Sequence, residues 1–528
     1  MLLCGLLPLR SVKDFIVVAG WKRSVLTVAL AGIAPWSAAT SQIPQSSAQA
    51  KCVAPPASNV ANEQGGVVVR FATPPAAGEF DALTASALSA RLSESLSSIL
   101  EASVRAATLQ RDSLSSSSGA AQLRVSPPDE RWLITGEVSN MGDVVTVNWR
   151  VLDTRSGRQV RAGRSRDNLI WMPRLATALL RAVGSSVGAD RRALAGVAAL
   201  EQHRATTSPP AMRAYLTGLY RLGSFGATAY KAAIGDFQSA LRLDPSFVDA
   251  YLGLATAHLR IVEWGDSASA RGRDPRLVAA GEAVNQALVR EPWSERALSL
   301  LAQVHIARDE PVAASIAVDA LRRSGARQAE VAWLTAEIRQ VQGNTTAASQ
   351  ALADAGSRIW GHVPALFLRA EIDRRQGRPQ LACLALNRVL TLDAAWAPAY
   401  VMRALVRADL GDRRGGWADA ELAGRLGRAE WGTAVSALID ISMGEARTVR
   451  LRARQRLSVD PDATLPWMDA LLRAAVFHAL GDPERARFAL ETLPCRDYRR
   501  RTLDGDPLLR FLRIPGDCRV SRQPASTE

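Results

Sequence analysis

Three stretches of this 528-residue chain share one spacing pattern, and they decide the fold of its second half. They read VAWLTAEIRQVQGNTTAASQALAD (331–354), ALFLRAEIDRRQGRPQLACLALNR (365–388) and AYVMRALVRADLGDRRGGWADAEL (399–422). Each begins 34 residues after the previous one and repeats an alanine column (Ala336, Ala370, Ala404) and a glycine column (Gly343, Gly377, Gly411). This period predicts a helical hairpin stacked into a solenoid, with small residues where helices approach and glycine at the turn.

Two further columns place a second helix after each glycine. They hold small or apolar residues at the same interval: Ala348, Ala382 and Gly416, then Leu352, Leu386 and Ala420. The set resembles the tetratricopeptide repeat, whose first helix carries an aromatic, a Leu-Gly pair and a Tyr, and whose second helix carries Ala, Phe and a final Pro. The best local match holds Ala233, Phe237, Ala240 and Pro245, and then Tyr251, Leu254, Ala255 and His258.

The resemblance covers residues 210–493, which corresponds to about eight hairpins at this repeat length. Two interruptions are expected, an insertion around residues 264–274 and an irregular unit around 444–461. Arg369 and Arg403 stand where the repeat usually has leucine. The fold class predicted for the chain is therefore mainly α, a tetratricopeptide-type helical-hairpin solenoid preceded by a small α+β domain.

The α+β domain is predicted over residues 66–195, with a linker at 196–209. Strands are expected at 66–71, 104–109, 132–138, 144–153 and 159–166, and helices at 81–100 and 173–187, the last three strands forming a meander. The strands VVVRF (67–71), LITGEV (133–138) and VNWRVLDTRSGRQV (147–160) resemble the domain related to the amino-terminal part of TolB. In relatives, that domain often precedes tetratricopeptide repeats in bacterial envelope and signalling proteins.

The first 39 residues are predicted to be a signal peptide or a membrane anchor. Lys22 and Arg23 precede a short apolar run (25–36) and the small residues 37–39, the order of a secretory leader. The run is short for a membrane span, which favours cleavage and export to the periplasm over retention as a membrane anchor. Residues 40–65 are rich in Ser, Ala, Gln and Pro and are predicted to be a flexible linker, and 494–528 a carboxyl-terminal extension.

The chain is strongly basic, with 65 Lys and Arg against 51 Asp and Glu and a formal net charge of +14. Such an excess attracts nucleic acid, an anionic membrane surface or an acidic protein partner. The alternative is that arginine is spread over solvated outer faces of helices. Nucleic acid is disfavoured because no nucleic-acid-binding module accompanies the arginines.

Five cysteines are too few for a disulfide-built scaffold. Cys495 and Cys518 bracket the final segment and are able to pair in an oxidising compartment, although the sequence leaves open whether they do. Cys383 is expected to be a small core residue, and Cys52 has no evident partner.

The sequence contains no HExxH, paired CxxC, phosphate-binding loop or GxSxG motif, so no catalytic residue, cofactor or metal is predicted. His258 and His305 occupy equivalent places on successive first helices. The two histidines could together bind a metal ion, but the repeat usually has a large packing residue at that position, which favours a structural role for both.

Binding is therefore the activity to consider. First helices of tetratricopeptide arrays line a concave surface that takes peptides or helices, and Arg296, Gln303 and Arg374 are the candidate groove residues, although an exposed polar helix face would look the same. The function predicted is a non-catalytic, exported repeat protein that mediates protein–protein interactions in the bacterial cell envelope. The alternatives are a periplasmic sensor or regulatory component of a signalling system, and an enzyme with an unrecognised site.

Overall fold

The computed structural model confirms the predicted fold class, a helical-hairpin solenoid preceded by a small α+β domain. It describes residues 52, 66–73, 79–100, 104–106, 130–187, 189, 205–224, 226–264, 274–442 and 467–491. The predicted leader (1–39), most of the predicted linkers, the irregular unit at 444–461 and the extension from 494 lie outside these residues.

The α+β domain contains one mixed five-stranded sheet, ordered β2-β1-β3-β4-β5. The predicted meander is confirmed, because β3, β4 and β5 pair antiparallel. The sequence did not reveal that β1 pairs in parallel with both β2 and β3. Glycines at positive φ, Gly142 and Gly157, make the two tight turns of the meander. The strands are β1 (Gly66–Ala72), β2 (Val104–Ala106), β3 (Glu130–Met141), β4 (Val144–Asp153) and β5 (Arg158–Asn168).

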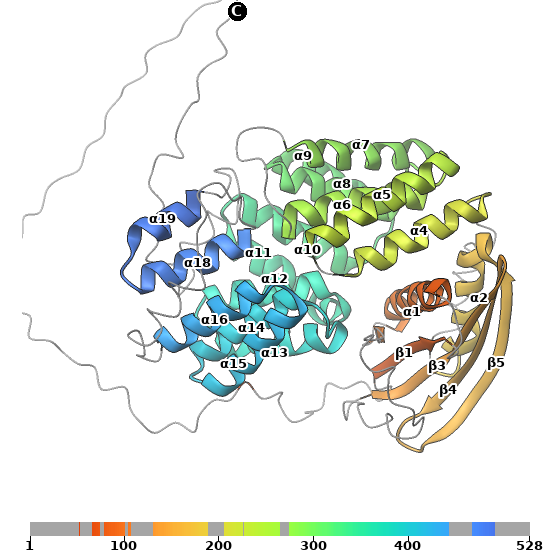
Figure 1. Ribbon diagram of the computed structural model, residues 1–528, viewed down its shortest axis with the longest axis horizontal. Coiled ribbons are helices and arrows are strands. Elements are labelled where there is room, and N and C mark those ends of the chain that lie inside the picture. The colour runs from red at the N-terminus through yellow and green to blue at the C-terminus, as the bar shows by residue number, and fades with distance from the viewer. Residues whose placement is uncertain are drawn as a thin grey trace, which may run out of the picture. The chain divides into compact units, whose positions relative to one another are not determined.

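Two helices, α1 (Glu79–Leu100) and α2 (Met172–Gly184), cover one face of this sheet (Figure 1). They contact each other as well as the strands, so they share that face. The alternation along β4 fits this arrangement, because Val145, Val147, Trp149 and Val151 are buried while Asn148 and Arg150 between them are exposed.

The core of the α+β domain continues into the first helices of the solenoid. One apolar cluster contains residues of α1 and α2 together with Met212, Phe237 and Phe247. Phe237 fills a slot between two glycines: an added Cβ would come within 2.7 Å of its ring at Gly218 and within 2.6 Å at Gly253. The two parts therefore share packing, and the first solenoid helix already begins at Pro209, inside the predicted linker.

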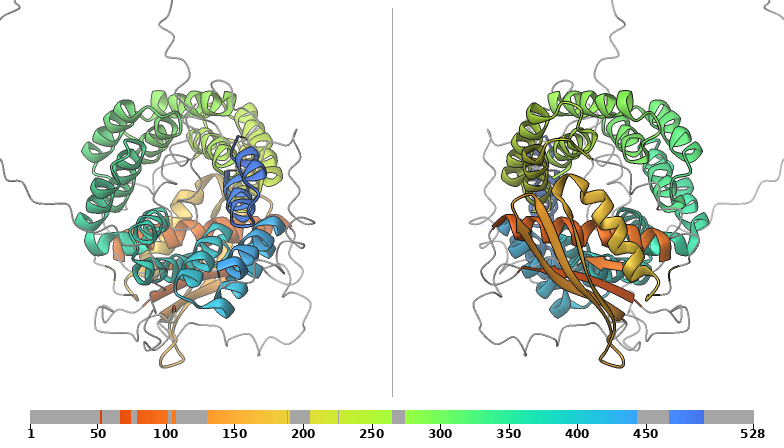
Figure 2. Two further views of the ribbon diagram at one scale, coloured as in Figure 1. Left: turned by 90° about the vertical axis from the view of Figure 1, so that its left-hand side faces the viewer. Right: turned by 90° about the vertical axis from the view of Figure 1, so that its right-hand side faces the viewer.

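The solenoid consists of hairpins that follow one another in sequence order (Figure 2). Their first helices are α4 (Pro209–Leu222), α6 (Val248–Trp264), α8 (Glu295–Ala307), α10 (Gln328–Val341), α12 (Val363–Arg375), α14 (Ala397–Asp409), α16 (Ala429–Ser442) and α18 (Trp467–Ala479). The described second helices are α5 (Ala227–Leu243), α7 (Pro275–Arg290), α9 (Pro311–Arg323), α11 (Thr345–Asp354), α13 (Pro379–Leu392), α15 (Arg413–Leu426) and α19 (Pro483–Glu491).

The repeat columns have the physical roles expected of them. Every alanine of the first column is fully buried, and the three column glycines have φ of 76°, 72° and 75°, the left-handed region that favours glycine. Asp309 occupies the same column one repeat earlier and takes φ 59°, so the backbone turn persists without glycine. The turn is a property of the hairpin, and glycine relieves its strain.

Candidate functional site: the first-helix layer and the disulfide

The first helices of successive hairpins contact one another from α4 to α18, so they form one continuous layer. The predicted groove residues Arg296 and Gln303 both lie on α8 in this layer. Arg296 is exposed, and its Nη1 binds Oδ1 of Asp249 on α6 at 2.9 Å. Gln303 is half-buried and donates from Nε2 to Oγ of Ser299 at 3.2 Å.

Arg374, the third predicted groove residue, does not belong to a surface. It is 2% exposed, and its Nε donates to Oδ2 of Asp409 on α14 at 2.7 Å. A guanidinium held in this way binds two first helices to each other. The prediction of a groove role was therefore wrong for Arg374, because sequence position alone does not tell whether a carboxylate lies in reach.

A polar cluster links three first helices in the same layer. Glu330 of α10 accepts hydrogen bonds from the hydroxyl of Ser299 on α8 and from Nε2 of His362, which caps α12, at 2.6 Å. His362 Nδ1 in turn accepts the backbone N–H of Ala365, which leaves the proton on Nε2 for the carboxylate. We call Ser299, Gln303, Glu330 and His362 the Glu330 cluster.

The Glu330 cluster is arranged for holding helices together. Burial by itself raises the pKa of Glu330, but the hydrogen bonds from His362 and Ser299, together with the positive charge of Arg327, outweigh it and lower the pKa. The carboxylate stands between the hydroxyl and the imidazole, whereas a nucleophilic serine needs the imidazole beside it. The order of the three groups therefore favours a structural role over acyl transfer.

The two histidines predicted to be structural, His258 and His305, have different surroundings. His305 Nδ1 lies 2.7 Å from Oε2 of Glu310. Burial, with the charge of Arg276, lowers the pKa of His258, and the charge of Asp274 raises it, with a net lowering. In the described ranges no three side chains of His, Cys, Asp or Glu come together as a metal site, and no helix there has the length and apolarity to cross a membrane.

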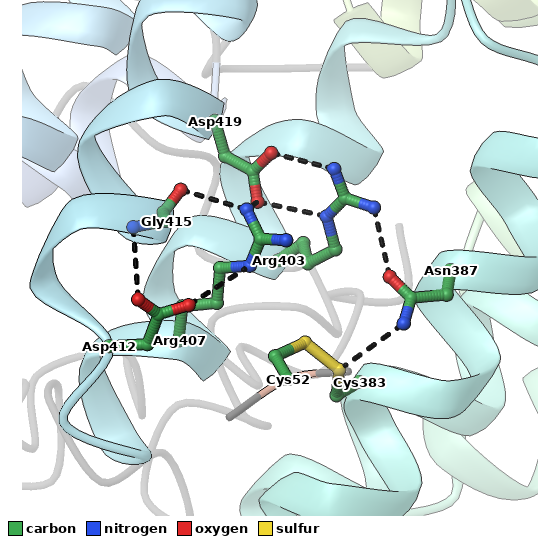
Figure 3. Close-up of a disulfide and its surroundings, with 8 residues drawn as sticks. All are labelled: Cys52, Cys383, Asn387, Arg403, Arg407, Asp412, Gly415 and Asp419. Carbon is green, nitrogen blue, oxygen red and sulfur yellow. Dashed lines mark hydrogen bonds and ion pairs between the residues drawn. A yellow bond between two sulfur atoms is a disulfide. The ribbon is translucent and has the colours of Figure 1, made fainter. Parts of the chain in front are cut away.

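The structure holds a disulfide that the sequence did not reveal, between Cys52 and Cys383 (Figure 3). The two cysteines are 331 residues apart and their Cα atoms are 5.9 Å apart, within the range of disulfides. Cys383 lies on α13, which β2 also contacts. The prediction that Cys52 has no partner was wrong, and a residue inside the predicted flexible linker is tied to the middle of the solenoid. Cys495 and Cys518 lie outside the described residues.

A network of half-buried arginines and a buried aspartate lies beside this disulfide (Figure 3). Arg403 of α14 binds the buried carboxylate of Asp419 on α15 through two nitrogens, at 2.8 and 2.7 Å, and reaches Oδ1 of Asn387 at 2.9 Å. Arg407 binds the same carboxylate at 2.8 Å. Asn387 also contacts the sulfur of Cys383 at 3.5 Å, so the network reaches the disulfide.

These contacts explain why arginine stands where the repeat usually has leucine. Arg403 forms an ion pair with Asp419. Arg369 forms one with the buried Asp373, one turn later on α12, where Nε of Arg369 lies 2.9 Å from Oδ2 of Asp373. The sequence held a signal for these pairs, because each arginine replaces the usual leucine and an aspartate follows it on the same hairpin, 4 residues after Arg369 and 16 residues after Arg403. It would have identified structural ion pairs, not a binding site.

No family model matches the chain, and no curated protein sequence matches it. The solved structures to which this chain is similar include tetratricopeptide repeat proteins, at low TM-scores. PilF of Pseudomonas aeruginosa is 16% identical over 40% of this chain and 92% of PilF, with a TM-score of 0.31. YrrB, described as having an unusual peptide-binding site, is 13% identical over 42% of this chain and 97% of YrrB, with a TM-score of 0.23. A tetratricopeptide repeat protein of Parabacteroides merdae is 15% identical over 51% of this chain and 98% of that protein, with a TM-score of 0.35. The fold assignment therefore stands on the phased hairpins of this chain.

Proposed function

We propose that this chain is a non-catalytic repeat protein that is exported to the cell envelope and holds protein partners there. The observation that carries the proposal is the continuous layer of first helices, on which exposed polar side chains such as that of Arg296 are presented. Stacked hairpins of this kind create extended binding surfaces.

The disulfide supports the export part of the proposal. Disulfides persist in oxidising compartments such as the bacterial periplasm and are rare where glutathione and thioredoxin keep thiols reduced. Cys52 and Cys383 are both buried and bonded to each other. The secretory leader predicted before Cys52 would direct the chain to the same oxidising compartment.

Crosslinking in intact cells tests the binding part. A photoreactive amino acid replaces Arg296 on the first-helix layer, and in a matched control it replaces Arg322, an exposed arginine of the second helix α9. We expect discrete protein adducts at position 296 and none at 322. Equal adducts at both positions, or none at 296, would refute a first-helix binding surface.

Thiol trapping tests the export part. Cells are alkylated before lysis, and the masses of the peptides that contain Cys52 and Cys383 are then measured. We expect the two cysteines to be bonded and unalkylated. Both thiols alkylated in intact cells would contradict export.

A further inference from the structure

The β4–β5 hairpin carries a concentration of positive charge. Between Val144 and Asn168 there are six arginines and two aspartates. All six arginines are exposed: Arg150, Arg155, Arg158, Arg161, Arg164 and Arg166.

None of these six forms an ion pair with a carboxylate of the described part of the chain. The two aspartates of the hairpin are engaged elsewhere. Asp167 binds Arg174 of α2 at 2.7 Å, and Asp153 accepts backbone N–H groups of the turn that follows it. The mutual repulsion of the six cations is therefore reduced only by solvent or by a bound partner, and not by carboxylates of the described residues.

The strand register places three of the cations on one face. Arg150 pairs with Ala162, Arg164 with Asn148 and Arg166 with Thr146. Paired residues point to the same side of a sheet, so these arginines lie on the face opposite the buried Trp149 and Val151. That outer face is the one that α1 and α2 do not cover.

The strand that bears most of these arginines is also the end of the sheet (Figure 1). β5 is 11 residues long and pairs with β4, and no other described strand continues the sheet beyond it. One of its two edges therefore presents backbone N–H and C=O groups that another extended chain can pair with.

Charge on an edge strand also protects against aggregation, and this is the simplest explanation for Arg164 and Arg166. It does not explain Arg150, because Arg150 lies on β4, which is paired with a strand on both sides. Single-stranded nucleic acid calls for exposed aromatic side chains to stack on, but the hairpin's Trp149 is 7% exposed. A membrane surface calls for several exposed apolar residues, and in β5 only Val160 is a large exposed one.

We infer that β5 docks an acidic, extended segment of a protein partner, which adds a strand to the sheet and sets its carboxylates against Arg164 and Arg166. Alternate residues of such a segment face the same side, so carboxylates at every second position meet the arginine row. The inference rests on the proposed function, that this chain binds proteins, and gives the chemistry of one such partner.

A labelled peptide of alternating Glu and Val, of the length of β5, tests the inference on the full chain by fluorescence anisotropy. We expect binding that weakens about tenfold or more in R164E/R166E, because rim and edge charge pairs contribute on this scale. R164Q/R166Q serves as a milder second variant and should weaken binding less. R322E/R323E on α9 removes the same charge elsewhere and should leave the affinity within about twofold.

The same peptide with alternate amides N-methylated keeps every carboxylate but cannot pair along an edge, and we expect it to bind about tenfold more weakly. Equal affinity of the methylated peptide would overturn strand addition. Better competition by phosphatidylglycerol vesicles or by single-stranded DNA, an equal loss in R322E/R323E, or no peptide binding would overturn the acidic protein segment. If the adducts at Arg296 persist in those cases, the inference fails while the proposed function stands.

Discussion

The arginines of the α14–α15 hairpin and those of the β4–β5 hairpin differ in whether a carboxylate lies in reach. Arg403 and Arg407 share the buried Asp419, whereas Arg164 and Arg166 are exposed and form no ion pair with the described residues. Taking a guanidinium out of water is costly unless a carboxylate accompanies it, and an exposed one keeps its solvation. The same residue type therefore holds the solenoid together in one region and is available to a partner in the other.

The largest effect expected is from Asp419→Ala. It leaves Arg403 and Arg407 without the carboxylate that both bind, and removing one partner from a buried ion pair costs about 3–5 kcal/mol. Urea unfolding followed by circular dichroism measures it. Asp319→Ala, which breaks the exposed pair with Arg322, is the matched control and should cost less than about 1 kcal/mol. Similar losses in the two variants would remove the distinction between buried and exposed arginines.

Cys52→Ser tests the covalent tie between the amino-terminal part and the solenoid. We expect a loss of about 2–4 kcal/mol in the free energy of unfolding, since the bond closes a long loop. Dithiothreitol should destabilise the wild type by the same amount and leave Cys52→Ser unchanged. A reductant effect that persists in the variant would place the sensitive disulfide elsewhere.

Gly377→Ala separates backbone strain from side-chain packing in the solenoid. Gly377 has φ 72° and open space around it, so alanine adds only the left-handed backbone cost of about 1–2 kcal/mol. Gly235 also has open space but lies within α5, and Gly235→Ala should instead stabilise by about 0.5–1 kcal/mol. Thermal unfolding of both variants checks the opposite signs; the same sign in both would contradict the repeat-turn account.

The smallest effect on stability is expected from R164E/R166E. Exposed substitutions away from the core usually change the free energy of unfolding by less than about 0.5 kcal/mol. The unfolding midpoint of the full chain measures it. A loss comparable to that of Asp419→Ala would mean that the β4–β5 arginines serve the fold after all.

Most of the fold could be predicted from periodicity. The 34-residue columns predicted the hairpins because each repeat requires a small buried residue such as Ala370 and a residue at positive φ such as Gly377. The strands of the meander followed from alternation in the same way. The parallel pairing of β1 with β3 did not, because long-range pairing leaves no local pattern.

The candidate sites were harder to predict because they depend on which distant residues meet. Cys52 and Cys383 are 331 residues apart, and nothing near either one signals the other. Arg296 and Arg374 look alike in the sequence, yet one is exposed and the other is buried against Asp409. The arginines of β5 can be read from the sequence, but only the strand order shows that β5 is an edge strand of the sheet.

We infer that the α14–α15 arginines stabilise the fold and that the β5 arginines bind a partner. Urea unfolding of the wild type, R164E/R166E and Asp419→Ala, each with and without the Glu-Val peptide at about a hundred times its Kd for the wild type, separates the two roles. Ligand at that level adds about 2.7 kcal/mol to a protein that binds it. We predict this gain for the wild type and, from a lower starting stability, for Asp419→Ala, whereas R164E/R166E starts at wild-type stability and gains much less. An equal gain in R164E/R166E, or a lowered starting stability there, would contradict the claim.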